Sequence, residues 1–432
     1  MLRLAYLADD FTGATDALET LARAGLRTRL FLRAPAADEC RGLDGVGVAA
    51  LSRSLSPDAM ETELRPAFTA LRALSPRHVH YKVCSTFDSS PAVGSIGRAI
   101  EIGAEVFGTA VVPVLVAAPA LGRYCAFGNL FARYGIGSAG IIHRLDRHPS
   151  ISRHPVTPMT EADLVVHLGR QTTLPIGLLD FRALENDASS AWAGLRTSGS
   201  RIVLIDGLNA AHLLHAGELL ENLPGATRFV VGSSGVGAAL CSYWTSEGML
   251  VPPSEHQRAE SQGPLLAVSG SCSPVTAGQV EWARGNGFEI VDADPNHPDA
   301  VSTLEQVVDG LRRGRHVIAC THTGRAEVHV GAEKLGAGLG RLARAAIAAA
   351  GVGRLVVAGG DTSSYAARTL GIESLEMAAP LSPGAPLCRA HATDSPVDGM
   401  LVNFKGGQVG APDYFGQAAG GTASGPVRGT ES

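Results

Sequence analysis

The sequence predicts an α/β protein of two domains, each a mainly parallel sheet flanked by helices. Short apolar segments rich in β-branched residues alternate with longer segments of helical spacing along nearly the whole chain. The chain has 432 residues, which at about 150 residues per domain suggests two or three domains. Hydrophobic residues make up 45% of it and charged residues 18%, so sizeable cores are expected and an intrinsically disordered chain is excluded.

The first half opens with an apolar strand over 2–7 and a helix over 14–24, with Thr15 or a neighbour as its expected cap. Because helices separate most of the strands, crossover connections and a parallel sheet follow. The other strands expected here are 29–32, 46–49, 79–83, 111–117, 176–179, 202–205 and 229–231, with helices over 59–74 and 161–171 and one from about Ser95.

Residues 251–264 are polar, carry three prolines and show no periodicity. We expect them to link a substrate-binding domain over 1–250 to a second domain over 265–415. The second domain is predicted to have strands at 265–268, 289–291, 316–319 and 355–358, and helices at 276–284 and 341–350. Residues 416–432, rich in Gly, Ser and Ala, are expected to be disordered.

Composition also narrows the function. The net charge is −5 and no long basic block occurs, which argues against a nucleic-acid partner. No run of about 18 apolar residues suggests a membrane span, and the N-terminus does not resemble a signal peptide. The seven cysteines are scattered without a CxxC pair, as expected for reduced thiols. A cytoplasmic protein is expected.

Two carboxylates, Asp9 and Asp10, follow the first strand and precede a Thr-Gly turn. Open α/β sheets bind ligands at the carboxyl ends of their strands. Because side chains alternate along a strand, we expect one carboxylate to face the ligand and the other to brace the loop. The alternative is a loop and cap role for Asp10, with Asp9 solvated.

A second strand end presents a lysine, hydroxyls and a carboxylate within residues 81–91. Lys82 can bind a carboxylate or phosphate as a point charge, and the hydroxyls can hydrogen-bond a polyol. A Ser-rich turn that caps the helix near Ser95 is the alternative. Only three of the 36 basic residues are lysines, and two of them, Lys82 and Lys405, lie in candidate ligand loops. Lys334 is expected to be ordinary surface.

Residues 122–159 are dense in cationic side chains and poor in helix signals, so we expect a long functional loop whose cations hold an anionic substrate. The histidines lack the i, i+4 spacing of a metal pair, and no metal site is expected in the chain. The charged and histidine residues of this segment are Arg123, His143, Arg144, Asp146, Arg147, His148, Arg153 and His154.

Three small-residue loops in the second half, at 270–273, 359–363 and 405–410, follow or precede apolar segments. Serine hydroxyls, glycine backbone and helix N-termini together suit phosphate groups, although plain strand-to-helix turns are the alternative. A GxxxxGK[ST] loop and an intact GxGxxG are absent from the sequence, so a nucleotide site here is not of the common types. The similar segment at 232–237 is expected to be only a turn.

The motifs DDFTGATD (9–16), GSCS (270–273), GGDTS (359–363) and KGGQVG (405–410), in this order, resemble the four-carbon acid sugar kinase family over residues 3–410. The resemblance implies an N-terminal domain that binds an acid sugar and a C-terminal domain that binds ATP. The implied reaction transfers the γ-phosphoryl group to a hydroxyl of a tetronate-type acid. Residues 82–90 are closest to the 3-oxo-tetronate kinase branch, rather than to threonate or erythronate kinases, whereas VGSIG (93–97) and KGGQVG depart from that branch.

By position, the resemblance implies substrate-domain motifs at Asp9, Asp10, Thr12, Lys82, Ser85, Thr86 and Asp88. It implies a nucleotide site at Ser271, Ser273, Gly359, Gly360, Asp361, Thr362, Lys405, Gly406 and Gly410. Our hypothesis is that Asp10 and Lys82 are the catalytic residues: Asp10 orients the attacking hydroxyl, and Lys82 holds the substrate carboxylate together with Arg123. Mg²⁺ would sit on the ATP phosphates with few protein ligands.

Two other classes of function stay open. One is a non-catalytic sensor of sugar acids and nucleotides. The other is an NAD-dependent dehydrogenase, against which the missing fingerprint counts. Related small-molecule kinases often dimerise, so a homodimer is a further expectation.

Overall fold

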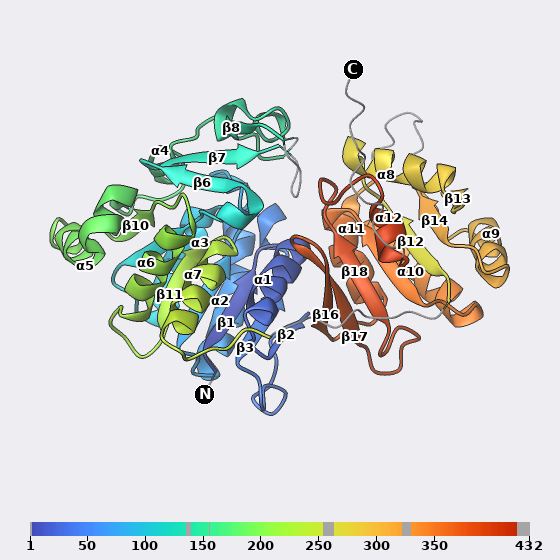
Figure 1. Ribbon diagram of the computed structural model, residues 1–432, viewed down its shortest axis with the longest axis horizontal. Coiled ribbons are helices and arrows are strands. Elements are labelled where there is room, and N and C mark those ends of the chain that lie inside the picture. Colours follow the sequence, from blue (N-terminus) through green and yellow to red (C-terminus); the bar gives the residue numbers. More distant parts are fainter. Residues whose placement is uncertain (1, 135–139, 155, 254–262, 322–329, 421–432) are drawn as a thin grey trace, which may run out of the picture. The chain divides into compact units, whose positions relative to one another are not determined.

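The structure, a computed structural model, describes residues 2–134, 140–154, 156–253, 263–321 and 330–420. It divides into two compact units, Met1–His256 with Ser374–Met377, and Gln257–Glu373 with Ala378–Ser432. Each unit has a largely parallel sheet with helices against it, so the predicted fold class is confirmed (Figure 1).

The main sheet of the first unit has eight parallel strands. The first two residues of β16 add to its edge antiparallel to β2. All eight were expected from the sequence, within a few residues. In spatial order they are β2 (Thr28–Phe31), β3 (Gly45–Ala49), β1 (Leu4–Ala8), β4 (His78–Lys82), β11 (Arg228–Gly232), β5 (Val112–Leu115), β10 (Ile202–Ile205) and β9 (Ile176–Leu179).

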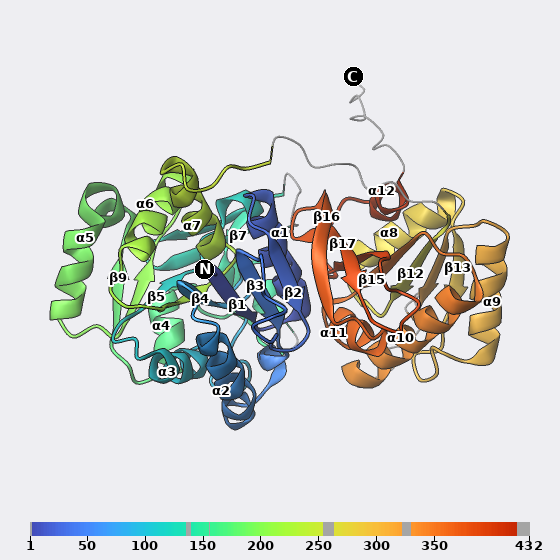
Figure 2. The same ribbon diagram turned by 90° about the horizontal axis from the view of Figure 1, so that it is seen from below.

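Helices cover both faces of this sheet because each buries one apolar stripe. Figure 2 shows α6 and α7 on one face and α2 and α3 on the other, and each pair packs together. The helices of this unit are α1 (Phe11–Arg23), α2 (Pro57–Ala73), α3 (Ile96–Phe107), α4 (Leu164–Gly169), α5 (Phe181–Thr197), α6 (Ala210–Glu221) and α7 (Gly235–Ser246). None of the described helices is long and apolar enough to cross a membrane.

The expectation of a long loop over 122–159 is wrong. This segment forms a three-stranded antiparallel sheet of β6 (Arg123–Ala126), β7 (Asn129–Arg133) and β8 (Ile142–Arg144), followed by two short 3-10 turns. Burial alternates along β6 and β7, a period-two pattern that the charged residues obscure in the sequence. Phe127 and Gly128 turn the hairpin with positive φ, and the Asp206 carboxylate accepts hydrogen bonds from both of their amides.

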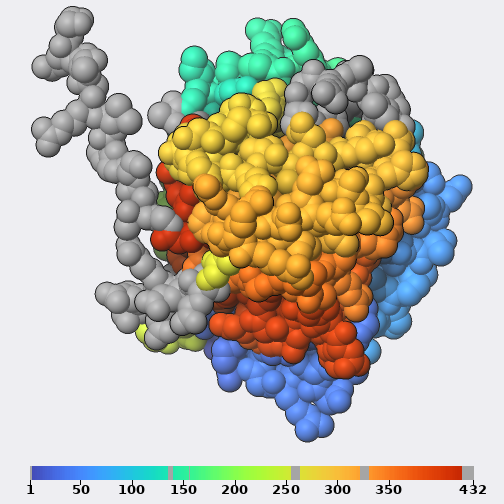
Figure 3. Space-filling model, turned by 90° about the vertical axis from the view of Figure 1, so that its right-hand side faces the viewer, coloured from blue at the N-terminus to red at the C-terminus, as the bar shows by residue number. Residues whose placement is uncertain are grey.

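The sheet of the second unit combines five parallel strands with an antiparallel edge. In order they are β13 (Glu289–Asp292), β14 (Val317–Cys320), β12 (Leu265–Ser269), β15 (Arg354–Ala358), β18 (Leu401–Lys405), β17 (Ala385–His391) and β16 (Ser374–Ser382). Its helices are α8 (Pro274–Gly285), α9 (Val301–Arg312), α10 (Ala332–Ala349), α11 (Gly360–Thr369) and α12 (Tyr414–Ala418). Figure 3 shows the face that carries α8 and α9, in yellow to orange.

Several boundaries differ from the expected ones. Helix α1 begins at Phe11 with Asp10 as its N-cap, so Thr15 is not the cap. The Thr15 hydroxyl instead donates to the Thr12 carbonyl inside the helix. Strands β16 to β18 were not expected, and α10 begins nine residues before 341. Helix α12 includes 416–418 of the segment expected to be disordered. Residues 421–432 and 254–262 of the expected tail and linker lie outside the described residues.

Candidate active site

The first candidate site lies at the carboxyl ends of β1 and β4 in the first unit. These strands are neighbours, and Ala8 lies opposite Lys82 in the register. The turn after β1 therefore emerges beside the turn after β4, and the Asp9 amide donates to the Lys82 carbonyl over 2.9 Å. On the other side of Lys82 lies Gly232, so the 232–237 segment, expected to be only a turn, borders the same site at the start of α7.

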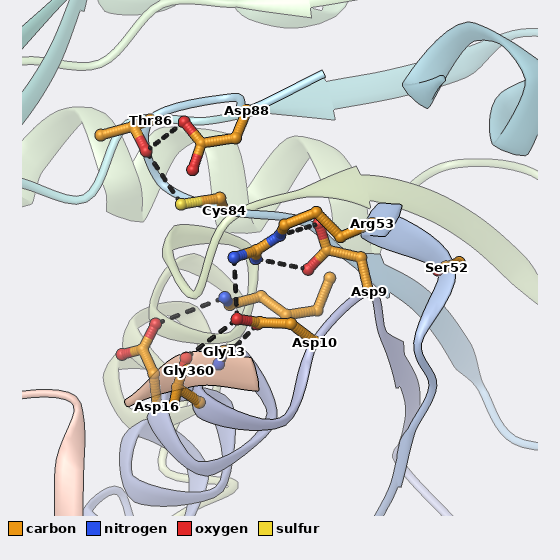
Figure 4. Close-up of polar contacts among 12 residues, drawn as sticks. Asp9, Asp10, Gly13, Asp16, Ser52, Arg53, Cys84, Thr86, Asp88 and Gly360 are labelled. Atoms are coloured by element: carbon orange, nitrogen blue, oxygen red, sulfur yellow. Dashed lines mark hydrogen bonds and ion pairs between the residues drawn. The ribbon is translucent and has the colours of Figure 1, made fainter. Parts of the chain in front are cut away.

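Arg53, which the motif analysis missed, joins the two carboxylates (Figure 4). Its Nε and Nη2 donate to the two oxygens of Asp9 over 3.1 and 2.8 Å, and its Nη1 donates to Asp10 Oδ2 over 2.7 Å. Asp9 is 3% exposed, so the alternative in which it is solvated is wrong. Asp9 and Asp10 do not point to opposite sides, because both reach the same guanidinium.

The Asp10 carboxylate accepts two further hydrogen bonds. The Gly13 amide donates to its Oδ1 over 2.7 Å, as an N-cap requires, and the Thr12 hydroxyl donates to its Oδ2 over 2.9 Å. Burial alone would raise the pKa of Asp10, but Arg53 and Lys82 outweigh it and lower that pKa. Burial raises the pKa of Asp9, although Arg53 opposes this. Asp10 is thus an ionised carboxylate held in one orientation.

Lys82 ends β4 with 1% of its surface exposed. Its Nζ lies 3.5 Å from Asp16 Oδ2, a residue that the motif analysis passed over. A Cβ at Gly13 would lie 2.4 Å from Asp10 Oδ1 and 2.9 Å from Lys82 Nζ. Glycine at this position therefore lets the backbone approach both charged groups closely.

The turn after β4 forms a chain of hydrogen bonds. Thr86 donates its hydroxyl proton to Asp88 Oδ1 over 2.9 Å, so the Cys84 thiol is the donor in its 2.9 Å contact with Thr86. Burial raises the pKa of Cys84 to about 12, which keeps it a thiol. Phe87 takes a φ of 57° in the middle of this turn and is fully buried. Ser85 is also buried, with 8% exposed.

Arg123 lies at the start of β6 and is 5% exposed. Its Nη1 donates to three backbone carbonyls, those of Leu121, Gly122 and Arg133. Among the described residues it has no ion pair, and its buried Nε has no hydrogen-bond partner. Burial lowers the pKa of this guanidinium, and the nearby acidic groups of Cys84, Asp88 and Asp16 only partly oppose the effect. The result is a buried cation without a paired anion.

A second candidate site lies in the other unit, at the carboxyl ends of β12, β15 and β18. These strands are adjacent, so the loops at 270–273, 359–362 and 405–410 meet at one edge. Ser271 Oγ accepts from the Ser273 amide, and Ser273 caps α8. Gly359 has a φ of +121°, and a Cβ there would lie 2.8 Å from Thr362 Oγ1. Gly360 starts α11, next to the exposed Asp361.

Lys405 is the last residue of β18 and has no exposed surface. Its Nζ donates to Thr276 Oγ1 over 2.9 Å and lies 5.3 Å from the centre of the Tyr414 ring. Burial lowers the pKa of Lys405 to about 7, and no ion pair holds it within the described residues. Gly406 and Gly410 follow in the loop, and a Cβ at Gly410 would lie 2.1 Å from the Tyr414 ring.

We predict that Lys405→Arg raises the KM for ATP about tenfold or more, because a guanidinium overfills this buried position and loses the geometry of the Thr276 contact. Steady-state kinetics with varied ATP measures this. Lys334→Arg is the matched control, since Lys334 is exposed in α10, as expected. Equal kinetics of the two variants would contradict a role for Lys405.

Two family models together match most of the chain. Residues 4–240 match the family model described as the sugar-binding N-terminal domain, and residues 266–415 match the nucleotide-binding C-terminal domain. The chain belongs to the four-carbon acid sugar kinase family. The family predicted from the motifs is thereby confirmed, as is the kinase class that it implies.

Among the relatives of this kinase is a 3-oxo-isoapionate kinase of Paraburkholderia graminis, 40% identical, with 98% of this chain and 95% of the relative covered. A 3-oxo-tetronate kinase of Pseudomonas fluorescens is 31% identical, with coverage of 98% and 97%. A solved structure, a putative tRNA synthase from Salmonella typhimurium LT2, superposes with a TM-score of 0.76 at 27% identity, with coverage of 97% and 98%.

Proposed function

We propose that the chain transfers the γ-phosphoryl group of ATP to a hydroxyl of a sugar acid, either a 3-oxo acid of the type named for its two kinase relatives or an acid of the threonate and erythronate type. The observation that carries the proposal is Arg123, a buried guanidinium without a carboxylate partner among the described residues. A buried charge is costly unless it is paired. The carboxylate of a sugar acid would supply that pair.

On the substrate side, Lys82 and Arg123 would hold the carboxylate, and Thr12, Ser85, Thr86 and Asp88 would contact or orient the polyol. Asp10 would orient the attacking hydroxyl. Its lowered pKa makes it a weak general base, which suits phosphoryl transfer, because positioning and charge neutralisation dominate that reaction. Asp9 would act through Arg53, which keeps the orientation of Asp10.

On the nucleotide side, the ATP phosphates would lie against the backbone amides and hydroxyls of Ser271, Ser273 and Gly359 to Thr362, with Lys405 beneath them. The N-termini of α8 and α11 and a buried ammonium fit an anion there. Within the described residues no cluster of three or more His, Cys, Asp and Glu side chains suits a metal. Mg²⁺ would therefore be held mainly by the phosphates, where it neutralises their charge.

The direct test is an ADP-release assay with a panel of 3-oxo-tetronate, 3-oxo-isoapionate, threonate and erythronate, with and without Mg²⁺. We expect ADP formation that depends on one of the 3-oxo acids and on the metal. Binding of acid and ATP without turnover would indicate a non-catalytic sensor instead. Hydride transfer with NAD and no ADP release would contradict the proposal.

We predict that Gly360→Val weakens ATP binding at least about tenfold, because the added side chain would occupy space that the phosphates need. A Cβ at Gly360 meets nothing within 4 Å, so the free chain accommodates it. Calorimetric titration with ATP and with the acid measures both affinities. Gly278→Val on α8 is the control, since a Cβ there also meets nothing. Loss of acid binding with intact ATP binding would reverse the assignment of the two sites.

We further propose 1–250 and 265–415 as the two domain limits, a cytoplasmic location and a homodimer. No disulfide is seen among the described residues, which include all seven cysteines, and this supports a reducing compartment. Light scattering of the purified chain tests the homodimer.

A further inference from the structure

Thr276 lies in the first turn of α8 and is 1% exposed. Its hydroxyl accepts hydrogen bonds from Ser271 Oγ over 3.2 Å and from Lys405 Nζ over 2.9 Å. It donates its own proton to the Gly407 carbonyl over 2.9 Å. A hydroxyl has one proton and two lone pairs, so this one is fully used. A single side chain thus joins the 270–273 loop to the 405–410 loop.

Gln279 lies three residues further along α8, on the same face of the helix. It is 1% exposed, and its Nε2 lies within hydrogen-bond distance of three successive carbonyls, those of Val409, Gly410 and Ala411, at 3.0 to 3.1 Å. These carbonyls have no strand partner, because β18 ends at Lys405. Gln279 therefore fixes the far end of the loop whose near end Thr276 holds.

The loops are also in close contact. A Cβ at Gly407 would lie 2.8 Å from Ser271 Oγ and 2.9 Å from Ser273 Cβ, so the backbone of the late loop rests directly on the serine loop. A shift of either loop changes the position of the other. Their relative position is then set by the helix beneath them.

We propose that Thr276 and Gln279 are positioning residues of the nucleotide site, which hold the serine loop and the 405–411 segment in the arrangement that binds the phosphates. The proposal rests on the proposed function, since it assumes that these loops bind ATP. Neither side chain touches the nucleotide, because both are buried beneath the loops. Thr276 also holds the ammonium of Lys405, which has no other hydrogen bond or ion pair within the described residues.

The test compares Thr276→Val, Thr276→Ser and Gln279→Met by calorimetric titration with ATP and by steady-state kinetics. Valine keeps the shape of threonine but loses the hydroxyl, which leaves Lys405 and Ser271 without their partner. We expect Thr276→Val to weaken ATP binding about tenfold or more and to raise the KM for ATP, with the KM for the acid unchanged. Serine restores the hydroxyl and should restore ATP affinity.

Thr303→Val is the matched control, a buried threonine on α9 of the same unit. If Thr276→Val and the control bind ATP as the unmodified chain does, the proposal is wrong. Gln279→Met is expected to weaken ATP binding even if Thr276→Val does not fold. Normal ATP affinity of Gln279→Met would also contradict the proposal. If the unmodified chain does not bind ATP, the proposed function fails, which is a different result.

Discussion

Asp10→Asn is expected to lower kcat about 100-fold or more while the protein stays folded. The carboxylate charge disappears, and with it the group that orients the attacking hydroxyl. Asparagine still caps a helix as well as aspartate does, so the bond from the Gly13 amide survives. Arg53 keeps its two bonds to Asp9, and the local fold keeps its ion pair. Kinetics with saturating acid and ATP, together with thermal unfolding, measures both quantities.

Asp58→Asn is the control for this variant. Asp58 is exposed in the first turn of α2, so its neutralisation should leave kcat unchanged. If Asp10→Asn kept near-normal kcat and unchanged substrate affinity, the catalytic role of Asp10 would be wrong. A low kcat that tracks a large fall in melting temperature would assign Asp10 to the fold alone.

Arg123→Met is expected to raise the KM for the acid about 100-fold, because a desolvated charge pair with the substrate carboxylate is lost. Methionine keeps much of the apolar volume. The variant loses the Nη1 bonds to three carbonyls but also removes an unpaired buried charge, and these two effects on the free energy of unfolding oppose each other. The KM for ATP should not change, which separates this effect from a general loss of structure.

Arg153→Met provides the comparison for Arg123. Arg153 belongs to the same cation-rich segment but is exposed, so its removal should leave the KM for the acid unchanged. If both variants behave alike, the segment attracts the acid only through its total charge. If neither changes the KM, the carboxylate is bound elsewhere, and Lys82 alone becomes the candidate.

The main strands were predictable because their signal is local. β1, β10 and β15 are short, mainly apolar runs of buried residues, and such runs stand out in the sequence whatever their neighbours are. β6 and β7 were missed because each is only four or five residues long and has an arginine at one end. β17 was missed because Pro386 and Arg389 interrupt its short run of apolar residues, and a proline argues against a strand.

The candidate sites, like the strands, were predictable only where the signal is local in the sequence. Residues at the end of a predicted buried strand, such as Asp10 after β1 and Lys82 in β4, can be found from their position in the sequence. Arg53 gave no such signal, since it lies 43 residues from the carboxylate that it holds and follows a strand by several positions. Nothing in the sequence indicated the role of Thr276 either, because a threonine inside a predicted helix does not by itself indicate a function. A charged residue shortly after β3, at the same edge of the sheet, was the one clue to Arg53.

The sequence by itself determined the class of fold, the two-part organisation and the family, because these depend on local periodicity and on motifs whose order survives in one dimension. Only the tertiary structure decided which polar groups work together. Asp9 and Asp10 share one guanidinium, Arg123 is a buried cation without an ion pair among the described residues, and Thr276 joins two loops more than 130 residues apart. Such relations depend on burial and on distances across the sheet, which no spacing along the chain contains.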